Sequence, residues 1–338
     1  MIDTLRLTGA DTSQAAEILQ GGGLVAFPTE TVYGLGANGL DAEAVAAIFA
    51  AKGRPQDNPL ILHIPGADHL ARYCQDIPDA AHALAARFWP GPLTMILKRQ
   101  SVVPDVVTAG LDTVGMRCPD HPVAREILEL CQLPIAAPSA NTSGKPSPTT
   151  AQAVWEDMAG RIAAVVDGGP CAVGVESTIV DLTVSPPRLL RPGGVTLEAL
   201  QEVLGQVAVD EAVVRLMSTD EKPRAPGMKY RHYAPKAPVT VVQGESDKTA
   251  AYIQAQLRPG VGVICFEDYV NLFPNCPCRS LGPEGDLGEQ ARRLFEALRW
   301  FDSQGVTAIY AQSPTADGLG LAVTNRLNKA AGFHIVEV

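Results

Sequence analysis

The residues best suited to chemistry appear first in the stretch AKGRPQDNPLILH (51–63). Lys52, Arg54 and Asn58 share a loop that contains two prolines, and His63 lies in the apolar run that follows. Cations on a stiffened loop suit an anion of defined geometry, such as a phosphate group. The simpler alternative is that these cations follow the end of a helix and only complement its dipole.

A second stretch, APSANTSGKPSPTT (137–150), is rich in hydroxyl and amide side chains, among them Ser139, Asn141 and Ser147. Its Gly-Lys pair does not form a phosphate-binding loop of the G-x-x-x-x-G-K-[ST] type, because Pro146 follows the lysine. The side chains could still cradle phosphate or ribose oxygens. A polar surface loop that caps the next helix would have a similar composition.

Two further candidates lie at predicted strand ends. Ser177 opens a strand in GVESTIVD (174–181), and Arg191 ends one in RLLRPGG (188–194). An arginine fixed at a strand end can bind phosphate through its planar fork of donors. A lone arginine in such a place is more often a surface charge.

The stretch FPTETVYGLGANG (27–39) contains the spacing G-x-G-x-x-G at Gly34, Gly36 and Gly39. Pro28 and three polar residues separate these glycines from the preceding apolar run, whereas a dinucleotide-binding turn begins directly at a strand end. We therefore interpret the glycines as a turn that requires positive φ. That interpretation leaves the hydroxyls and the carboxylate just before them unexplained.

A basic segment stands out in an acidic chain. The net charge is −10, yet KPRAPGMKYRHYAPKAP (222–238) holds five lysines and arginines and no carboxylate. A protein that coats duplex nucleic acid shows a broad basic face, so a short basic strip suits a small anion better than a polymer. The bland alternative is a passive linker.

Composition limits the other possibilities. The 338 residues, with 46% hydrophobic and 19% charged content, indicate a globular chain of two domains. Seven scattered cysteines match no common zinc pattern, and no apolar run could span a bilayer. The N-terminus does not resemble a secretory signal, so we expect a cytoplasmic protein.

The first half of the chain alternates strand-like and helix-like runs, which predicts an α/β fold with a mixed sheet. Strands are expected at 22–27, 59–64, 92–98, 113–118, 134–140, 163–169, 177–183 and 187–193, and helices at 41–53, 78–91 and 121–133. A second alternating pattern begins at Pro238, with strands in PVTVVQG, GVGVICF and VTAIYAQ. It predicts a smaller Rossmann-like, three-layer α/β domain with a parallel sheet. We expect domains at 1–208 and 239–338, joined by a linker at 209–238.

Taken together and in order, PTETVYGLG, KGRPQDNPL, PGPLTMIL, VGMRCP, APSANTSGKPSPT, GVESTIVD and RPG resemble the YrdC-type threonylcarbamoyl-AMP synthases. The resemblance spans roughly residues 10–200. The basic segment and the second domain are similar to the long, two-domain form of that enzyme. The resemblance implies a twisted, open YrdC-like sheet with the site in its concave face.

The resemblance also implies the reaction. L-threonine, bicarbonate or CO2, and ATP would give threonylcarbamoyl-AMP and pyrophosphate, for threonylcarbamoyladenosine modification of tRNA next to the anticodon. Mg²⁺ would accompany ATP without direct side-chain ligation, and no organic cofactor is expected. A downstream tRNA threonylcarbamoyl transferase would be a partner, whereas neither a membrane nor a stable nucleic-acid complex is expected. Two alternatives stay open, a carbamoyltransferase that uses another adenylate and a non-enzymatic RNA-binding module.

Site residues follow by resemblance. Lys52 and Arg54 would act on the triphosphate. The ATP site would comprise Arg54, Asn58, Thr113, Ser139, Asn141, Ser147, Arg191 and Tyr230. The threonine site would comprise Thr31, His63, Arg117, Ala137 and Ser177. The segment 222–238 would form a lid, with Tyr230 at the nucleotide and Lys229, Arg231 and His232 nearby.

Overall fold

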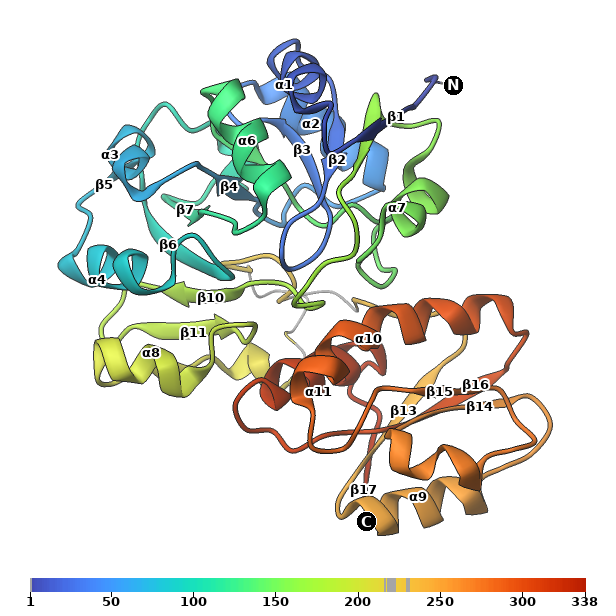
Figure 1. The fold of residues 1–338 in the computed structure, drawn as a ribbon. Coiled ribbons are helices and arrows are strands. Elements are labelled where there is room, and N and C mark those ends of the chain that lie inside the picture. Colours follow the sequence, from blue (N-terminus) through green and yellow to red (C-terminus); the bar gives the residue numbers. More distant parts are fainter. Residues whose placement is uncertain (1, 216, 218–222, 229–231) are drawn as a thin grey trace.

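The computed structural model describes residues 2–215, 217, 223–228 and 232–338. Within them, twelve strands form one mixed sheet in the order β1-β9-β2-β3-β8-β4-β7-β6-β10-β11-β12, with β5 paired to β6 (Figure 1). The strands are β1 (Leu5–Thr8), β2 (Val25–Phe27), β3 (Gly34–Asn38), β4 (Ile61–His63), β5 (Cys74–Gln75), β6 (Leu93–Arg99), β7 (Thr113–Arg117), β8 (Ile135–Ala136), β9 (Ala164–Asp167), β10 (Thr178–Asp181), β11 (Arg188–Arg191) and β12 (Ala208–Val209).

Helices pack against this sheet. They are α1 (Thr12–Gln20), α2 (Ala42–Lys52), α3 (Leu70–Tyr73), α4 (Asp79–Phe88), α5 (Asp105–Thr108), α6 (Pro122–Cys131), α7 (Ala151–Met158) and α8 (Leu197–Leu204). Every strand and helix predicted between residues 22 and 193 is present, so the α/β prediction is confirmed. The structure adds β1, α1, β3, β5, α5, α8 and β12, none of which was predicted.

Helix α2 shows why the local predictions hold. The Asp41 side chain accepts hydrogen bonds from the backbone N–H groups of Glu43 and Ala44, at 2.9 and 3.2 Å. At the other end Gly53 adopts the left-handed conformation, at φ 61°. An acidic N-cap and a glycine just past the last turn are the standard start and stop of a helix.

The interpretation of the three glycines as a turn is wrong. Gly34 and Gly36 lie in β3, antiparallel to β2, and none of the three has a positive φ. Close packing explains them instead. A Cβ on Gly36 would lie 2.7 Å from Phe27, and one on Gly39 would lie 2.5 Å from Leu62.

A second, wholly parallel sheet follows in the order β15-β14-β16-β13-β17. Its strands are β13 (Val239–Gln243), β14 (Val261–Cys265), β15 (Cys278–Ser280), β16 (Ala308–Gln312) and β17 (Ile335–Glu337), and its helices are α9 (Ser246–Ala255), α10 (Leu287–Trp300) and α11 (Gly320–Ala330). Helices α10 and α11 pack on one face and α9 on the other, which confirms the three-layer prediction (Figure 1). Only β15 and β17 were missed, and both are short edge strands.

Strand register lines up four polar residues and one isoleucine across the first sheet. His63 of β4 pairs with Arg117 of β7, Arg117 with Thr94 of β6, Thr94 with Ile179 of β10, and Ile179 with Arg191 of β11. Paired residues on adjacent strands are neighbours on one face of a sheet. Residues far apart in sequence, from 63 to 191, are therefore gathered into one row.

The second domain lies against the first through α10 and α11 (Figure 1). Arg299 of α10 reaches Asp157 at 2.8 Å, and Arg326 of α11 reaches Glu176 at 2.9 Å. Both carboxylates belong to the first domain and are almost fully buried. Among the described residues, no helix is long and apolar enough to cross a lipid bilayer.

Candidate active site

A cavity along the polar row, lined by His63, Arg117 and Arg191, holds about 730 Å³ of empty space, part of it open to solvent. It gathers most of the residues proposed for the two substrates. Those that line it are Thr31, Lys52, Arg54, His63, Arg117, Ala137, Ser139, Asn141, Ser147, Ser177 and Arg191. They come from the end of α2, from strand ends and from the loops that follow β2 and β8.

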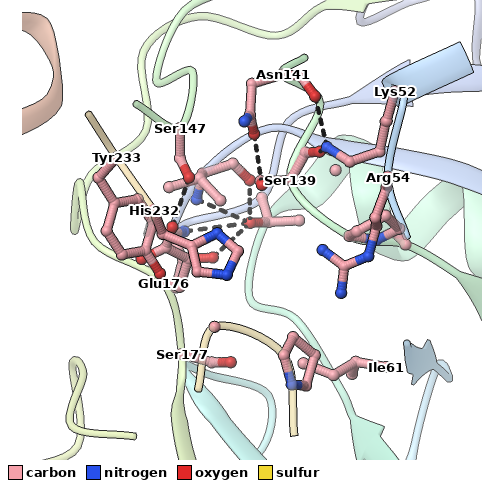
Figure 2. A pocket seen from close by; sticks show the side chains of 18 of the residues that line it. Lys52, Arg54, Ile61, Ser139, Asn141, Ser147, Glu176, Ser177, His232 and Tyr233 are labelled. Carbon is pink, nitrogen blue, oxygen red and sulfur yellow. Dashed lines mark hydrogen bonds between the residues drawn. The ribbon is translucent and has the colours of Figure 1, made fainter. Parts of the chain in front are cut away.

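One wall is made by α2 and the loop of residues 139–147. The ammonium group of Lys52 donates to the backbone carbonyl of Ser139 and to that of Asn141, the latter at 2.6 Å (Figure 2). Burial, reinforced by Arg54, lowers the pKa of Lys52 well below its ordinary value. Lys52 therefore fixes the loop through two backbone carbonyls.

Within the same loop, side chains brace one another. The Ser139 hydroxyl donates to the Asn141 side-chain oxygen at 2.6 Å, and the Asn141 amide donates to the carbonyls of Thr142 and Lys145. Arg54 lies opposite, and its Nη2 donates to the carbonyls of Asn58 and Pro59 at 3.4 and 3.3 Å. These bonds hold cationic and hydroxyl groups around a common space (Figure 2).

The far end of the cavity is built on Arg117. Its Nη2 lies 2.7 Å from the Glu30 carboxylate and donates to the Thr31 hydroxyl at 2.9 Å. The Glu30 carboxylate in turn accepts from the Asp120 N–H at 3.0 Å. The Arg117 Nε is buried and meets no hydrogen-bond partner among the described residues. A fixed guanidinium with an unused donor is suited to a substrate carboxylate.

His63 lies beside Arg117 and is buried, at 3% exposure. Burial, and then the neighbouring Arg117 charge, lowers the pKa of His63 to about 3. The imidazole is therefore neutral at pH 7. Its Nδ1 is buried without a hydrogen-bond partner in the described part of the chain. A neutral ring can donate and accept, so this atom can pair with a polar substrate.

A third wall is formed by Glu176, Ser177 and Arg191. The Ser147 hydroxyl donates to the Glu176 carboxylate at 2.5 Å, and Arg191 donates to the Ser177 carbonyl and hydroxyl at 3.0 and 3.1 Å. Burial opposes ionisation of Glu176, but Arg326 and Arg191 outweigh it and hold the pKa below its ordinary value. Burial lowers the pKa of Arg191 to about 10, which still leaves it charged at neutral pH.

Part of the basic segment lines the cavity. Pro226, Gly227, His232 and Tyr233 line it, and the carbonyl of Pro226 accepts from Arg191 at 3.3 Å. Tyr233 is 5% exposed and stacks on Phe295 of α10, with ring centroids 5.1 Å apart. The proposed nucleotide residue Tyr230 lies outside the described residues, as do Lys229 and Arg231.

Two other candidates do not line the cavity. Thr113 begins β7, and four residues of strand, about 13 Å, separate it from Arg117 at the cavity end. The Asn58 side chain is buried and pairs with no described residue, while its carbonyl accepts from Arg54. Their assignment to ATP stays a prediction.

Family models and known proteins account for nearly the whole chain. The family described as telomere recombination, Sua5/YciO/YrdC, matches residues 17–193, and the one described as the C-terminal domain of threonylcarbamoyl-AMP synthase matches residues 195–332. The chain belongs to the threonylcarbamoyl-AMP synthase family.

Members of the family resemble this chain over nearly their full length. A threonylcarbamoyl-AMP synthase of Pyrococcus abyssi is 50% identical over 331 residues, which cover 96% of this chain and 95% of the relative. One of Bacillus subtilis is 46% identical over 337 residues, covering 99% and 96%. The crystal structure of P. abyssi Sua5 complexed with L-threonine superposes with a TM-score of 0.94 at 47% identity, over 99% of this chain and 100% of that one.

Several cavity residues in this member of the family were not assigned to a substrate from sequence. Thr29, Lys145, Glu176, Gly227 and Tyr233 line the cavity, and Glu30 and Arg326 support it from behind. Glu30 and Glu176 lie inside stretches that looked functional, so an acidic residue next to a predicted site hydroxyl was the available signal. Arg326 carried none, because its partner is 150 positions away.

Proposed function

We propose that this chain makes L-threonylcarbamoyl-AMP and pyrophosphate from L-threonine, CO2 or bicarbonate, and ATP. The observation that carries the proposal is a single cavity with two chemically different ends. Arg117 and His63 suit an amino acid at one end, while Arg54, Arg191 and the loop of residues 139–147 suit a nucleotide at the other. Between them two substrates can react without leaving the site.

The chemistry needs alignment more than a strong nucleophile. The threonine amine adds to CO2 and loses a proton, which gives a carbamate. A carbamate oxygen then forms a bond to the α-phosphorus of ATP as the bond to pyrophosphate breaks. Such phosphoryl chemistry depends on positioning and on charge neutralisation of the transferred group. No covalent link to the protein is required.

At the amino-acid end, Arg117 would bind the threonine carboxylate through its Nε, which meets no hydrogen-bond partner among the described residues. Thr31 or Ser177 would meet the substrate hydroxyl, and His63 and the backbone at Ala137 would complete the pocket. These groups are buried, at 6% exposure or less. A site built to pair a substrate hydroxyl rejects analogues that lack it, because its own polar groups would be left unpaired.

At the nucleotide end, Arg54 and Arg191 would neutralise phosphate oxygens, and Ser139, Asn141 and Ser147 would donate to phosphate or ribose. Lys52 would act mainly by holding this loop, with its positive charge near the triphosphate. Asn58, Thr113 and Tyr230 remain proposed ATP contacts. The transition state gains most from donors that are already fixed, because no reorganisation is then needed during the reaction.

Mg²⁺ would enter with ATP. The described residues include no cluster of three or more His, Cys, Asp or Glu side chains that could hold a metal ion. Glu30 and Glu176 are already engaged by Arg117 and Arg326. Mg²⁺ is commonly held by substrate phosphates and water with few protein ligands, which fits this set of residues. When bound, the ion would help neutralise the phosphate charge.

The linker of residues 209–238 would act as a lid between domains 1–208 and 239–338. Its described residues Pro226, Gly227, His232 and Tyr233 line the cavity. A closed lid would exclude water from an adenylate that hydrolyses readily. The product would pass to a tRNA threonylcarbamoyl transferase for modification next to the anticodon, in the cytoplasm and without a stable nucleic-acid complex.

Pyrophosphate release tests the proposal. The protein is incubated with ATP and Mg²⁺, and threonine and bicarbonate are each added or left out. Release is expected only when both are present, because the carbamate is the attacking group. Equal release without threonine would overturn the proposed function.

A further inference from the structure

Helix α11 of the second domain carries polar and charged residues on a buried face, where it contacts the first domain and the linker. Asn325, Arg326 and Lys329 are at most 2% exposed, and each donates to a carbonyl or carboxylate of the first domain or the linker. A buried cation is costly unless it is paired. Such a helix face therefore indicates a specific contact rather than ordinary packing.

The described hydrogen bonds of Arg326 lead mainly to the wall of the cavity, apart from one from its Nη1 to the Asn325 side chain at 3.0 Å. Its Nε donates to the Glu176 carboxylate at 2.9 Å, and its Nη2 donates to the Glu176 carbonyl at 3.3 Å. Its Nη1 donates to the carbonyl of Pro192 at 2.7 Å. The other Glu176 oxygen accepts from Ser147 (Figure 2). One guanidinium thus braces Ser147 through a carboxylate and also holds the residue that follows Arg191.

Arg299 of α10 holds the same loop from another side. Its Nη2 donates to the Pro146 carbonyl at 2.6 Å and to the Asp157 carboxylate at 2.8 Å. Asp157 also accepts from the Thr142 N–H at 3.3 Å and from the Lys145 ammonium at 2.9 Å. Both ends of the segment 142–147 are therefore tied to a single arginine of the second domain.

We infer that the second domain completes the nucleotide end of the cavity, with Arg326 and Arg299 as positioning residues for the loop of residues 139–147. Neither side chain lines the cavity, so both act through Glu176, Asp157 and the loop backbone. The inference rests on the proposed function and gives the second domain a part in nucleotide binding. Misplacing donors by about 1 Å can cost on the order of a hundredfold in an enzyme site.

Direct binding is the test, because it does not depend on turnover. Isothermal titration calorimetry measures the Kd of a non-hydrolysable ATP analogue with Mg²⁺, and separately that of L-threonine, for the full-length protein. Arg299→Met and Arg326→Met are expected to weaken analogue binding by roughly tenfold or more. Arg299→Met should leave threonine binding within about threefold, because its contacts avoid Arg117 and His63.

The matched control is Arg293→Met. Arg293 lies on α10 and pairs only with Glu289 and Glu267 among the described residues, both in the second domain. Its removal should change neither Kd. Because Arg326→Met leaves the Glu176 carboxylate buried without its partner, Arg326→Lys serves as a second variant. Lysine keeps the charge but not the fork that bridges two carbonyls, so analogue binding should still weaken severalfold.

Each outcome is decisive. If wild-type protein binds the analogue and folded Arg299→Met and Arg326→Lys bind it equally well, the inference is wrong. The same holds if Arg299→Met loses threonine and the analogue to the same extent, because the effect is then not local to the loop. If wild-type protein binds neither ligand, the proposed function fails before the inference is reached.

Discussion

Replacing Arg117 by methionine should produce two separable defects. Arg117 is 4% exposed, pairs with Glu30 at 2.7 Å and donates to the Thr31 hydroxyl at 2.9 Å. Methionine fills similar space and removes the charge. The variant should lose affinity for threonine, because the carboxylate partner is gone. It should also lose stability, because the Glu30 carboxylate stays buried without its partner.

The structure sets the expected size of each defect. A hydrogen bond to a charged group contributes about 1.5–3 kcal/mol, which corresponds to a roughly 10- to 150-fold weaker Kd. Breaking a buried ion pair by removing one partner costs about 3–5 kcal/mol of folding stability. The Asp120 N–H still donates to Glu30 in the variant, so the stability loss should fall toward the lower end.

A double variant separates the two effects. In Glu30→Gln/Arg117→Met neither member of this ion pair carries a charge, so much of the stability should return while threonine binding stays weak. Calorimetry with L-threonine alone measures the affinity, and urea unfolding of the first domain measures the stability. Recovery of threonine affinity in the double variant would refute the reasoning, because Arg117 would then act only through the fold.

Three further predictions address other parts of the chain. The pKa of His63 is lowered from its ordinary value of about 6.5 to about 3 in the folded protein. Between these two pH values only the unfolded state takes up the proton, so the stability decreases as the pH is lowered. His63→Gln should therefore reduce the slope of the unfolding free energy against pH, between about pH 6 and 4, by about 1.4 kcal/mol per pH unit. An unchanged slope would contradict the burial argument. Arg54→Ala should weaken binding of an ATP analogue more than binding of threonine, because its fork suits phosphate; calorimetry that finds a threonine defect alone would reverse the assignment. Gly36→Ala should destabilise the protein by about 1–3 kcal/mol through overpacking against Phe27. The control Gly285→Ala should not, because no heavy atom lies within 4 Å of the new Cβ. Equal urea unfolding midpoints for the two variants would count against the packing explanation.

Local chemistry made much of the fold predictable. Asp41 and Gly53 mark the ends of α2 through capping, which depends only on neighbouring residues. The cavity loops were visible as stretches of hydroxyls and cations beside prolines, although a polar surface loop has a similar composition. The short edge strands were not, since β12, β15 and β17 take their conformation from a neighbouring strand rather than from their own sequence.

Contacts between residues far apart in the chain could not be predicted from the sequence. Gly36 looked like a turn glycine, but its reason is the approach of Phe27 and Ile135 from two neighbouring strands. Arg326 lies in a helix whose composition is ordinary, and only the folded structure brings it to Glu176. Glu176 lies beside the predicted site residue Ser177, but nothing in the sequence identifies its arginine partner. Sequence thus indicates which groups can bind a ligand better than it indicates what holds them in place.

The central claim is that one cavity joins an amino-acid carbamate to the α-phosphorus of ATP. Mass spectrometry of the product made from ATP, L-threonine and ¹³C-labelled bicarbonate tests it most directly. The account predicts threonylcarbamoyl-AMP that carries the heavy carbon, formed together with pyrophosphate. A threonine adenylate without the labelled carbon, or a labelled product that contains no AMP, would contradict it.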